Sequence, residues 1–148
     1  MRLIKFIPDH AKELVYEDKL SIGTMRPEHD WEHHMERASQ HDSWTGIENG
    51  HIIFAAGVIP MWNGVVECWF IGSDRIQSKL KTVVKTTIDV MGKMPYSRMH
   101  ANVRANWKEA IRFAEFLGFE KEGVMKKFGP EGSDYLVMGR IKKCQEQK

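Results

Sequence analysis

Three apolar runs in the middle of the chain are separated by two Asn-Gly pairs, Asn49-Gly50 and Asn63-Gly64. An Asn-Gly pair between apolar runs is a strong signal for a two-residue hairpin turn. The pattern therefore predicts three antiparallel strands, over residues 43–48, 51–62 and 65–72. Pro60 has no amide hydrogen to donate, so it predicts a bulge, a bend or an edge position in the second strand.

Apolar residues recur at helical spacing in four other segments, which predicts helices over residues 10–20, 28–40, 75–91 and 107–117. Asp9 is the predicted N-cap of the first helix, and Gly118 the predicted residue just past the end of the last. Shorter apolar segments predict further strands over residues 2–7, 97–103, 122–129 and 134–141.

This order of elements predicts an α/β domain, because antiparallel strands come first and a strand-helix-strand unit follows. The strand-helix-strand unit should be parallel with a right-handed crossover. We expect a mixed central sheet of about seven strands with helices on both faces. With 148 residues, 42% hydrophobic and 28% charged, residues 1–148 suit a single domain.

Composition restricts the partners and the compartment. A net charge of +2 and a pI near 8.5 are too mild to predict nucleic-acid binding, which usually needs a concentrated basic face. Two cysteines make a disulfide framework improbable and favour a reducing cytoplasm. Neither a signal-peptide core nor an apolar run of membrane-spanning length occurs, so we expect a cytoplasmic protein without membrane contact.

One stretch carries a family signature. Asn106-Trp107-Lys108-Glu109-Ala110-Ile111-Arg112-Phe113 leads into Leu117-Gly118-Phe119-Glu120 and Glu122-Gly123, and Asp134-Tyr135 precedes a last apolar strand. The stretch resembles the second half of the GNAT (Gcn5-related N-acetyltransferase) superfamily. The match covers about forty residues closely and the rest by element order. It implies a GNAT-like, acyl-CoA N-acyltransferase fold, which often dimerises through its late strands.

A narrower likeness lies earlier in the chain. Cys68-Trp69-Phe70-Ile71-Gly72-Ser73-Asp74 followed by a helix resembles a GNAT-like group of internal virion or morphogenesis proteins from tailed phages. It implies a phage or prophage origin. If the protein is a structural component of a phage, it implies a place in the virion and a phage or host protein as partner.

The GNAT resemblance implies acetyl-CoA, or another acyl-CoA, as the cofactor. Its pantetheine would pair with the edge of strand 65–72, at Phe70, Ile71 and Gly72, in a gap bordered by Asn102. The pyrophosphate would meet the start of the next helix, where a helix terminus favours an anion. The side chains available there and at the following helix are Arg75, Gln77, Ser78, Lys79 and Asn106.

The phosphate loop departs from the family. GNAT proteins carry glycines after the strand so that backbone amides approach the phosphates closely. No glycine follows Gly72 in this loop. Capping of the helix by Ser73 and Asp74, without any CoA, is therefore an alternative. Asn106 has a similar alternative, as a plain N-cap of the helix that follows it.

Transfer to an amine needs a base within hydrogen-bond reach of the attacking nitrogen. Glu67 is the candidate, because many GNAT proteins place a carboxylate at this point of the strand; the alternative is a solvent-facing edge residue. The usual acid of the family is a Tyr that follows the helical Phe, and Ala114 stands there. Tyr135 or Ser133 is the candidate substitute.

The acceptor site of the family is shaped by the first two helices, which makes Trp31, His34 and Trp44 candidate substrate contacts. His29 and His33 have zinc-compatible spacing, but nothing completes a ligand set, so no metal is predicted. The resulting hypothesis is an acyl-CoA-dependent N-acyltransferase acting by direct transfer on an amine of a small molecule or a protein. The alternative is a catalytically degenerate GNAT-fold phage protein with a structural or host-interaction role.

Overall fold

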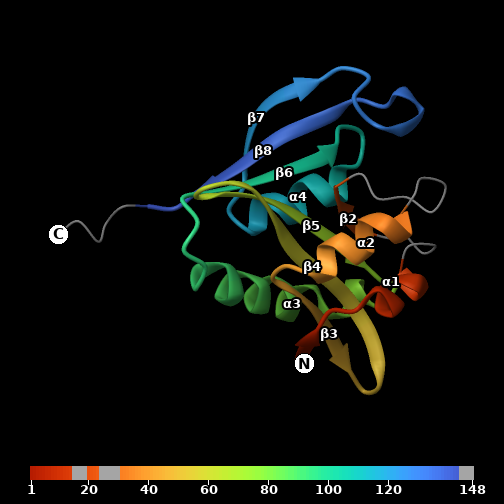
Figure 1. Cartoon of the computed structure of the whole chain (residues 1–148). Coiled ribbons are helices and arrows are strands. Elements are labelled where there is room, and N and C mark those ends of the chain that lie inside the picture. The colour runs from red at the N-terminus through yellow and green to blue at the C-terminus, as the bar shows by residue number, and fades with distance from the viewer. Residues whose placement is uncertain (15–19, 24–30, 144–148) are drawn as a thin grey trace.

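The computed structural model describes residues 1–14, 20–23 and 31–143 (Figure 1). Eight strands and four helices lie within them, with a short 3₁₀ turn, Pro130–Gly132, before the last strand. In chain order the elements are β1 (Arg2–Lys5), α1 (Pro8–Leu14), β2 (Leu20–Ile22), α2 (Trp31–Ser39), β3 (Ser43–Glu48), β4 (His51–Trp62), β5 (Val65–Gly72), α3 (Ile76–Gly92), β6 (Arg98–Arg104), α4 (Lys108–Phe116), β7 (Glu120–Met125) and β8 (Tyr135–Ile141).

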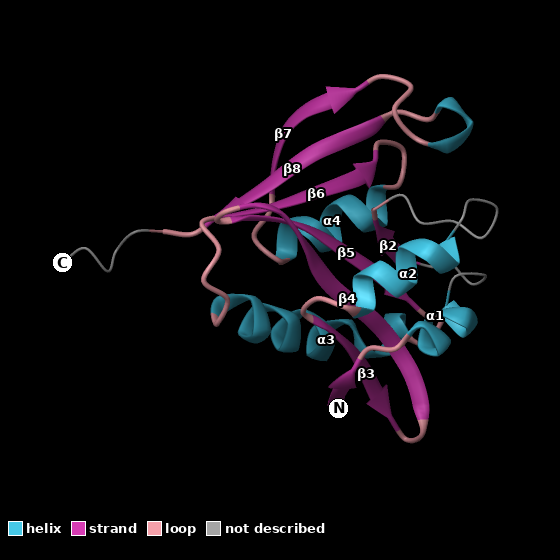
Figure 2. Ribbon diagram, viewed as in Figure 1, coloured by secondary structure: helices cyan, strands magenta, loops and turns pink. Residues whose placement is uncertain are grey.

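The strands form one mixed sheet in the order β1-β3-β4-β5-β6-β8-β7, and β2 pairs with β5 off this path. Among the described strands, β5 and β6 are the pair that runs parallel, on either side of the α3 crossover, as the strand-helix-strand pattern predicts. Helices α1 and α2 cover one face of the sheet, and α3 and α4 cover the other (Figure 2). The predicted mixed α/β class is confirmed.

Local turn chemistry accounts for the meander of β3, β4 and β5. Asn49 and Gly50 both have positive φ, 54° and 77°, as a type I′ hairpin turn requires. The pairing register shifts between Pro60 and Trp62, which is the irregularity that a proline in a strand predicts. These turns fix which face each side chain of β5 occupies.

The end of α4 is capped as its sequence predicts. Gly118 lies at φ 99°, a conformation that glycine adopts without a steric penalty. The Phe119 N–H donates to the Ala114 carbonyl and the Gly118 N–H to the Glu115 carbonyl, each at 3.0 Å. This pair of bonds is the Schellman motif, which turns the chain from α4 into β7.

The N-terminal region differs from the prediction. Helix α1 begins at Pro8, whose fixed φ suits a first helical position, so Asp9 lies in the first turn and is not the cap. The predicted helix over 10–20 is wrong at its end, because Leu20 belongs to strand β2. Residues 15–19 of that prediction, and 28–30 of the next helix, lie outside the described residues. No helix in the described part is long and apolar enough to span a bilayer.

Candidate functional site

Strands β5 and β6 pair along only a short seam. Val65, Val66 and Glu67 of β5 stand opposite residues 98–100 of β6, and the two strands diverge beyond this point. Glu67 therefore lies at the apex of a wedge-shaped gap in the sheet. Side chains alternate along a strand, so Glu67 shares its face with Trp69 and Ile71, which pack against α1 and α2.

A chain of hydrogen bonds leads to the Glu67 carboxylate. Asn102 Nδ2 donates to Glu67 Oε2 at 3.2 Å, and His100 Nε2 lies 3.0 Å from Asn102 Oδ1. Arg98 Nη2 lies 3.2 Å from His100 Nδ1. The three β6 residues alternate along one face of the strand, and this spacing brings them into one line.

The donors in this chain have a fixed direction. Arginine can only donate, so His100 Nδ1 must accept and His100 Nε2 must carry the proton. His100 Nε2 then donates to Asn102, whose amide group in turn donates to Glu67. Glu67 Oε1 accepts no hydrogen bond from the described part of the chain, which leaves it available to a substrate proton.

Beyond His100 the chain ends in an ion pair. Arg98 donates from Nη1 and Nη2 to the two carboxylate oxygens of Glu122, at 2.9 and 2.8 Å. The hydrogen bond from Arg98 lowers the pKa of Glu122, and the same contact raises the pKa of Arg98. Arg98 is therefore held in place by β7 while it contacts His100.

Strand β2 occupies the edge of β5 inside the gap. Leu20, Ser21 and Ile22 pair antiparallel with Gly72, Ile71 and Phe70, in that order. The next residue completes a bridge across the gap, because the Gly23 N–H donates to the Asn102 carbonyl at 2.8 Å. The expected contacts of the pantetheine are thus already made by the chain itself. Phe70, Ile71 and Gly72 pair with β2, and the Asn102 carbonyl accepts from the Gly23 N–H.

The loop between β5 and α3 is held by hydrogen bonds to β4 and within the loop itself. The Ser73 N–H donates to the Ile53 carbonyl at 2.9 Å, and the Arg75 N–H donates to Ser73 Oγ at 3.2 Å. Ser78 Oγ donates back to the Arg75 carbonyl at 3.1 Å. The Arg75 side chain is exposed and makes no cap hydrogen bond, although Arg75 is the N-cap residue of α3.

Lys79 and Gln77 differ in what surrounds them. Lys79 forms an ion pair with Glu48 at the end of β3, and this hydrogen bond lowers the pKa of Glu48. Gln77 lines a cleft of about 270 Å³ between α3 and α4, together with Arg112 and Leu20. Of the predicted phosphate ligands, Gln77 is the one that faces a cavity opening toward α4.

The candidate acid, Tyr135, lies further along the sheet face that carries Glu67. Tyr135 begins β8 opposite Arg104, and its buried ring packs edge-on against Phe128 with centroids 5.8 Å apart. Arg104 is four residues beyond His100, which puts Tyr135 about 13 Å along the strand from the Glu67 position. Ala114 is fully buried against the sheet and supplies no acid.

Asn106 is not the cap of α4. It is an exposed turn residue, and the N-cap position belongs to Trp107, without a side-chain cap bond. The alternative of plain capping by Asn106 is therefore wrong. Its proposed contact with a cofactor stays a prediction.

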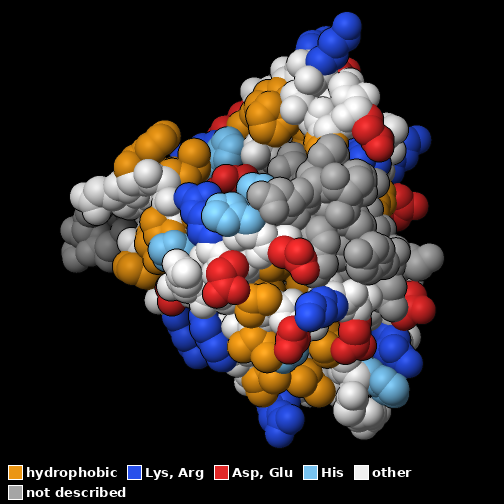
Figure 3. Space-filling model, turned by 45° about the vertical axis from the view of Figure 1, so that its right-hand side comes forward, with side chains coloured by type: hydrophobic (Ala, Val, Ile, Leu, Met, Phe, Trp, Pro, Cys, Tyr) orange, Lys and Arg blue, Asp and Glu red, His pale blue; other side chains and the backbone are white. Residues whose placement is uncertain are grey.

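The three candidate acceptor contacts separate. His34 is exposed on α2. Figure 3 shows a face of the molecule on which histidine side chains lie among acidic and basic ones. Trp44 is 9% exposed and belongs to the core cluster between the sheet and α3, on the face opposite Glu67. This corrects its expected role, since its indole lies on the other side of the sheet from Glu67. Trp31 begins α2, and its side chain lies outside the described residues.

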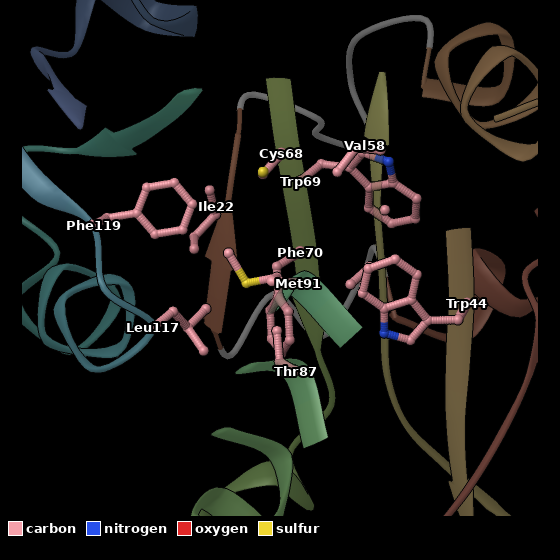
Figure 4. Close-up of a pocket in the computed structure, with 12 residues that line it drawn as sticks. Ile22, Trp44, Val58, Cys68, Trp69, Phe70, Thr87, Met91, Leu117 and Phe119 are labelled. Atoms are coloured by element: carbon pink, nitrogen blue, oxygen red, sulfur yellow. The ribbon is translucent and has the colours of Figure 1, made fainter. Parts of the chain in front are cut away.

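Cys68 lines a small apolar cavity of about 20 Å³ with Ile22, Phe70 and Phe119 (Figure 4). Burial raises the pKa of its thiol to about 12, so the reactive thiolate is absent near neutral pH. Among the described residues no group of three or more His, Cys, Asp or Glu side chains could hold a metal ion. His29, half of the zinc-compatible pair, lies outside them.

Comparisons with known proteins bear on the fold. No family model matches the sequence, and no curated protein matches it significantly. Among solved structures, Ard1 from Thermoplasma volcanium aligns with a TM-score of 0.74 and 14% identity over 95% of this chain and 96% of that chain. The ribosomal-protein-alanine N-acetyltransferase from Brucella melitensis aligns with a TM-score of 0.70 and 16% identity over 96% and 100%.

A spermidine N-acetyltransferase chimera from Vibrio cholerae aligns less completely, with a TM-score of 0.57 and 17% identity. This chain covers 65% of that chain's length, and 67% of this chain is aligned. The fold is therefore that of the GNAT acyl-CoA N-acyltransferases, as the resemblance over residues 106–141 implies. At these identities the likeness establishes the architecture and no activity.

The sequence reasoning missed Arg98, His100 and Glu122, as well as strand β2. A signal for the first two was present, because Arg98, His100, Asn102 and Arg104 alternate with apolar residues in the predicted strand. Such alternation places several polar side chains on one face of a central strand, where they need partners. No comparable signal marks β2, which is only three residues long.

Proposed function

We propose that the protein is an acyl-CoA-dependent N-acyltransferase, using acetyl-CoA or a related acyl-CoA, that transfers the acyl group directly to an amine with Glu67 as the base. The observation that carries the proposal is the position of Glu67. Its carboxylate lies at the apex of the β5–β6 gap, where Asn102 holds Oε2 and no described residue donates to Oε1. A base in this position must be oriented before the amine arrives, and the β6 side chains provide that orientation.

The residues around the gap fit the chemistry of an acyl-CoA in part. The edge of β5 at Phe70–Gly72 accepts an amide-bearing extended chain, since β2 pairs there through its backbone. The pantetheine arm is also an extended chain with amide groups, and Gln77 and Arg112 line the cleft beyond. The phosphate loop fits less well, because the Ser73 and Arg75 amides donate within the protein.

When bound, an acyl-CoA supplies an activated thioester carbonyl. Glu67 Oε1 accepts a proton from the acceptor ammonium group, which leaves the nitrogen lone pair free to attack. Asn102 keeps the carboxylate oriented through Oε2, and His100 keeps the Asn102 amide oriented. Tyr135, at the start of β8, is the proposed proton donor to the leaving thiolate. The proposed contacts of the cofactor are Arg75, Gln77, Ser78, Lys79 and Asn106.

The acceptor is proposed to approach from the α2 side. Met35 and Ala38 of α2 pack with Trp69 and Ile71, so this helix covers the sheet face that carries Glu67. The exposed residues of α2 include two acidic side chains, one basic side chain and two histidines: Glu32, Glu36, Arg37, His33 and His34. This mixture favours neither a cationic nor an anionic acceptor. The amine belongs to a small molecule or to a protein.

Acetyl transfer to a panel of primary amines tests the proposal, with Glu67→Gln as the diagnostic variant. Glutamine keeps an oxygen that accepts from Asn102, so the fold should be retained while the base is lost. We expect kcat to fall by roughly 10²- to 10⁴-fold, the usual contribution of a general base. Equal rates for both proteins would exclude Glu67 as the base.

The paired edge of β5 favours a second candidate, a GNAT-fold protein of phage origin that acts in virion assembly or on a host protein and binds no cofactor. In this case β2 is a permanent strand of the sheet. Calorimetry with millimolar acetyl-CoA separates the candidates, since heat of binding supports the transferase. Absence of binding, together with a stable complex with a phage or host protein, would support the second candidate.

A further inference from the structure

Strand β2 bridges both sides of the gap in which the proposed cofactor would lie. On one side it pairs with Phe70–Gly72 of β5, and on the other the Gly23 N–H donates to the Asn102 carbonyl of β6 at 2.8 Å. A pantetheine arm that paired with the same edge of β5 would need the same backbone groups. One edge of one strand holds one partner at a time.

Side-chain packing favours the state in which β2 is paired with the edge of β5. Leu20 and Ile22 are 4% and 3% exposed and belong to the core cluster under α3 and α4. Figure 4 shows Ile22 between Phe119 and the β5 side chains that line the same cavity. Leu20 also forms part of the wall of the cleft that Gln77 lines. Each side chain removes apolar surface from water when β2 is paired.

Gly72 leaves space for the Ile76 side chain of α3 and for the backbone of β2. A Cβ at this position would lie 3.3 Å from the Leu20 carbonyl oxygen and 2.8 Å from Ile76 Cδ1. A side chain at this position would therefore crowd both α3 and β2. In the described part of the chain, three residues of β2 hold the pairing with β5.

We propose that β2 is an internal competitor of the acyl-CoA, so that the cofactor binds only to molecules in which β2 has left the edge of β5. This inference rests on the proposed function and adds a regulatory step to it. The observed structure is the closed state of the site. The apparent affinity for the cofactor is then the intrinsic affinity reduced by the fraction of molecules that are open.

A matched pair of variants tests the competition. Leu20→Ser weakens the packing of β2. Leu136→Ser makes the same change in β8, where Leu136 is 5% exposed and pairs with β6 and β7, not with β5 or β2. We expect Leu20→Ser to bind acetyl-CoA about tenfold more tightly than the wild type, because burial of one leucine shifts a docking equilibrium by at least that factor. Leu136→Ser should bind like the wild type.

A disulfide provides the opposite test. Ser21 and Ile71 stand directly opposite each other, so cysteines at both positions lie within bridging range. In a background with Cys68→Ala and Cys144→Ala, the oxidised protein should lose acetyl-CoA binding and the reduced protein should recover it. This test holds even if Leu20→Ser fails to fold.

The outcomes distinguish the two proposals. If the oxidised protein binds acetyl-CoA as well as the reduced protein does, β2 is no competitor, and the proposed transferase function is unaffected. The same conclusion follows if a folded Leu20→Ser protein binds like the wild type. If no form binds acetyl-CoA at millimolar concentration, both the competition and the proposed function are overturned.

Discussion

The hydrogen-bonded chain on β6 makes a prediction that does not depend on activity. Replacing His100 with Leu removes the donor to Asn102 Oδ1, which lies 3.0 Å from His100 Nε2. Asn102 is 7% exposed, so water cannot replace that donor freely. An unsatisfied buried polar atom costs about 1–3 kcal/mol, which is the expected loss in the free energy of unfolding. For a chain of 148 residues each kcal/mol lowers Tm by about 2–4 °C.

Asn102→Leu should cost a similar amount, because it leaves the His100 N–H and Glu67 Oε2 without their partners. The double variant removes both halves of the first bond at once. We therefore expect its cost to be smaller than the sum of the single costs by about 1 kcal/mol, within the range measured for contacting polar pairs.

Urea unfolding with a constant m-value measures all of these free energies. The control combines His100→Leu with Thr87→Val on α3, across the sheet, and there we expect the costs to add. Additivity of the His100 and Asn102 substitutions to within about 0.5 kcal/mol would refute the hydrogen-bonded chain and the orientation of Glu67 that depends on it.

Three further predictions concern stability and reactivity. Thr87→Val should raise the free energy of unfolding by about 1 kcal/mol in urea titrations, because Thr87 Oγ1 is buried and has no hydrogen-bond partner in the described part of the chain. Cys68, with its pKa near 12, should resist iodoacetamide at pH 8 in the folded protein and react after unfolding, as peptide mass spectrometry would show. Gly129→Ala should lower Tm by several degrees, since a Cβ there would lie 2.1 Å from the Tyr135 ring and overpacking costs about 1–3 kcal/mol. Gly123→Ala, with no neighbour within 4 Å of the added Cβ, is the control, and an equal Tm for both variants would contradict the steric argument.

Much of the fold was predictable because its signals are local. The Asn49-Gly50 turn, the Pro60 bulge and the Gly118 cap each follow from the backbone chemistry of one or two residues. The long apolar repeat of α3 spans many turns, so its helical period is unambiguous. These elements fix the order of the sheet.

Strand β2 was not predictable in this way. Leu20, Ser21 and Ile22 form a strand only because an edge of β5 is open beside them, and that edge lies fifty residues further along the chain. A three-residue segment has no period of its own, and the preceding apolar pattern continued as a helix. Tertiary pairing decided its structure.

The site was predictable in part. The position of Glu67 followed from the family resemblance, and the structure adds the Asn102 contact, the chain to Arg98 and the face of the strand. The role of Trp44, in contrast, was not predicted correctly. Its residue type suits an acceptor pocket, but the register of β3 turns it into the core beneath α3. A one-residue difference in strand register decides which face a side chain occupies, and the sequence pattern around Trp44 did not specify it.

The three-residue seam between β5 and β6 also has a consequence for how the molecule unfolds. The sheet consists of an N-terminal part, β1, β3, β4 and β5, and a C-terminal part, β6, β8 and β7, each with extensive internal pairing. Within the sheet, backbone pairing joins the two parts at residues 65–67 of β5 and through the bridge formed by β2. Native-state hydrogen exchange should therefore resolve two cooperative units, and β2, drawn from the N-terminal part of the chain, is the strand that couples the opening of one to the other.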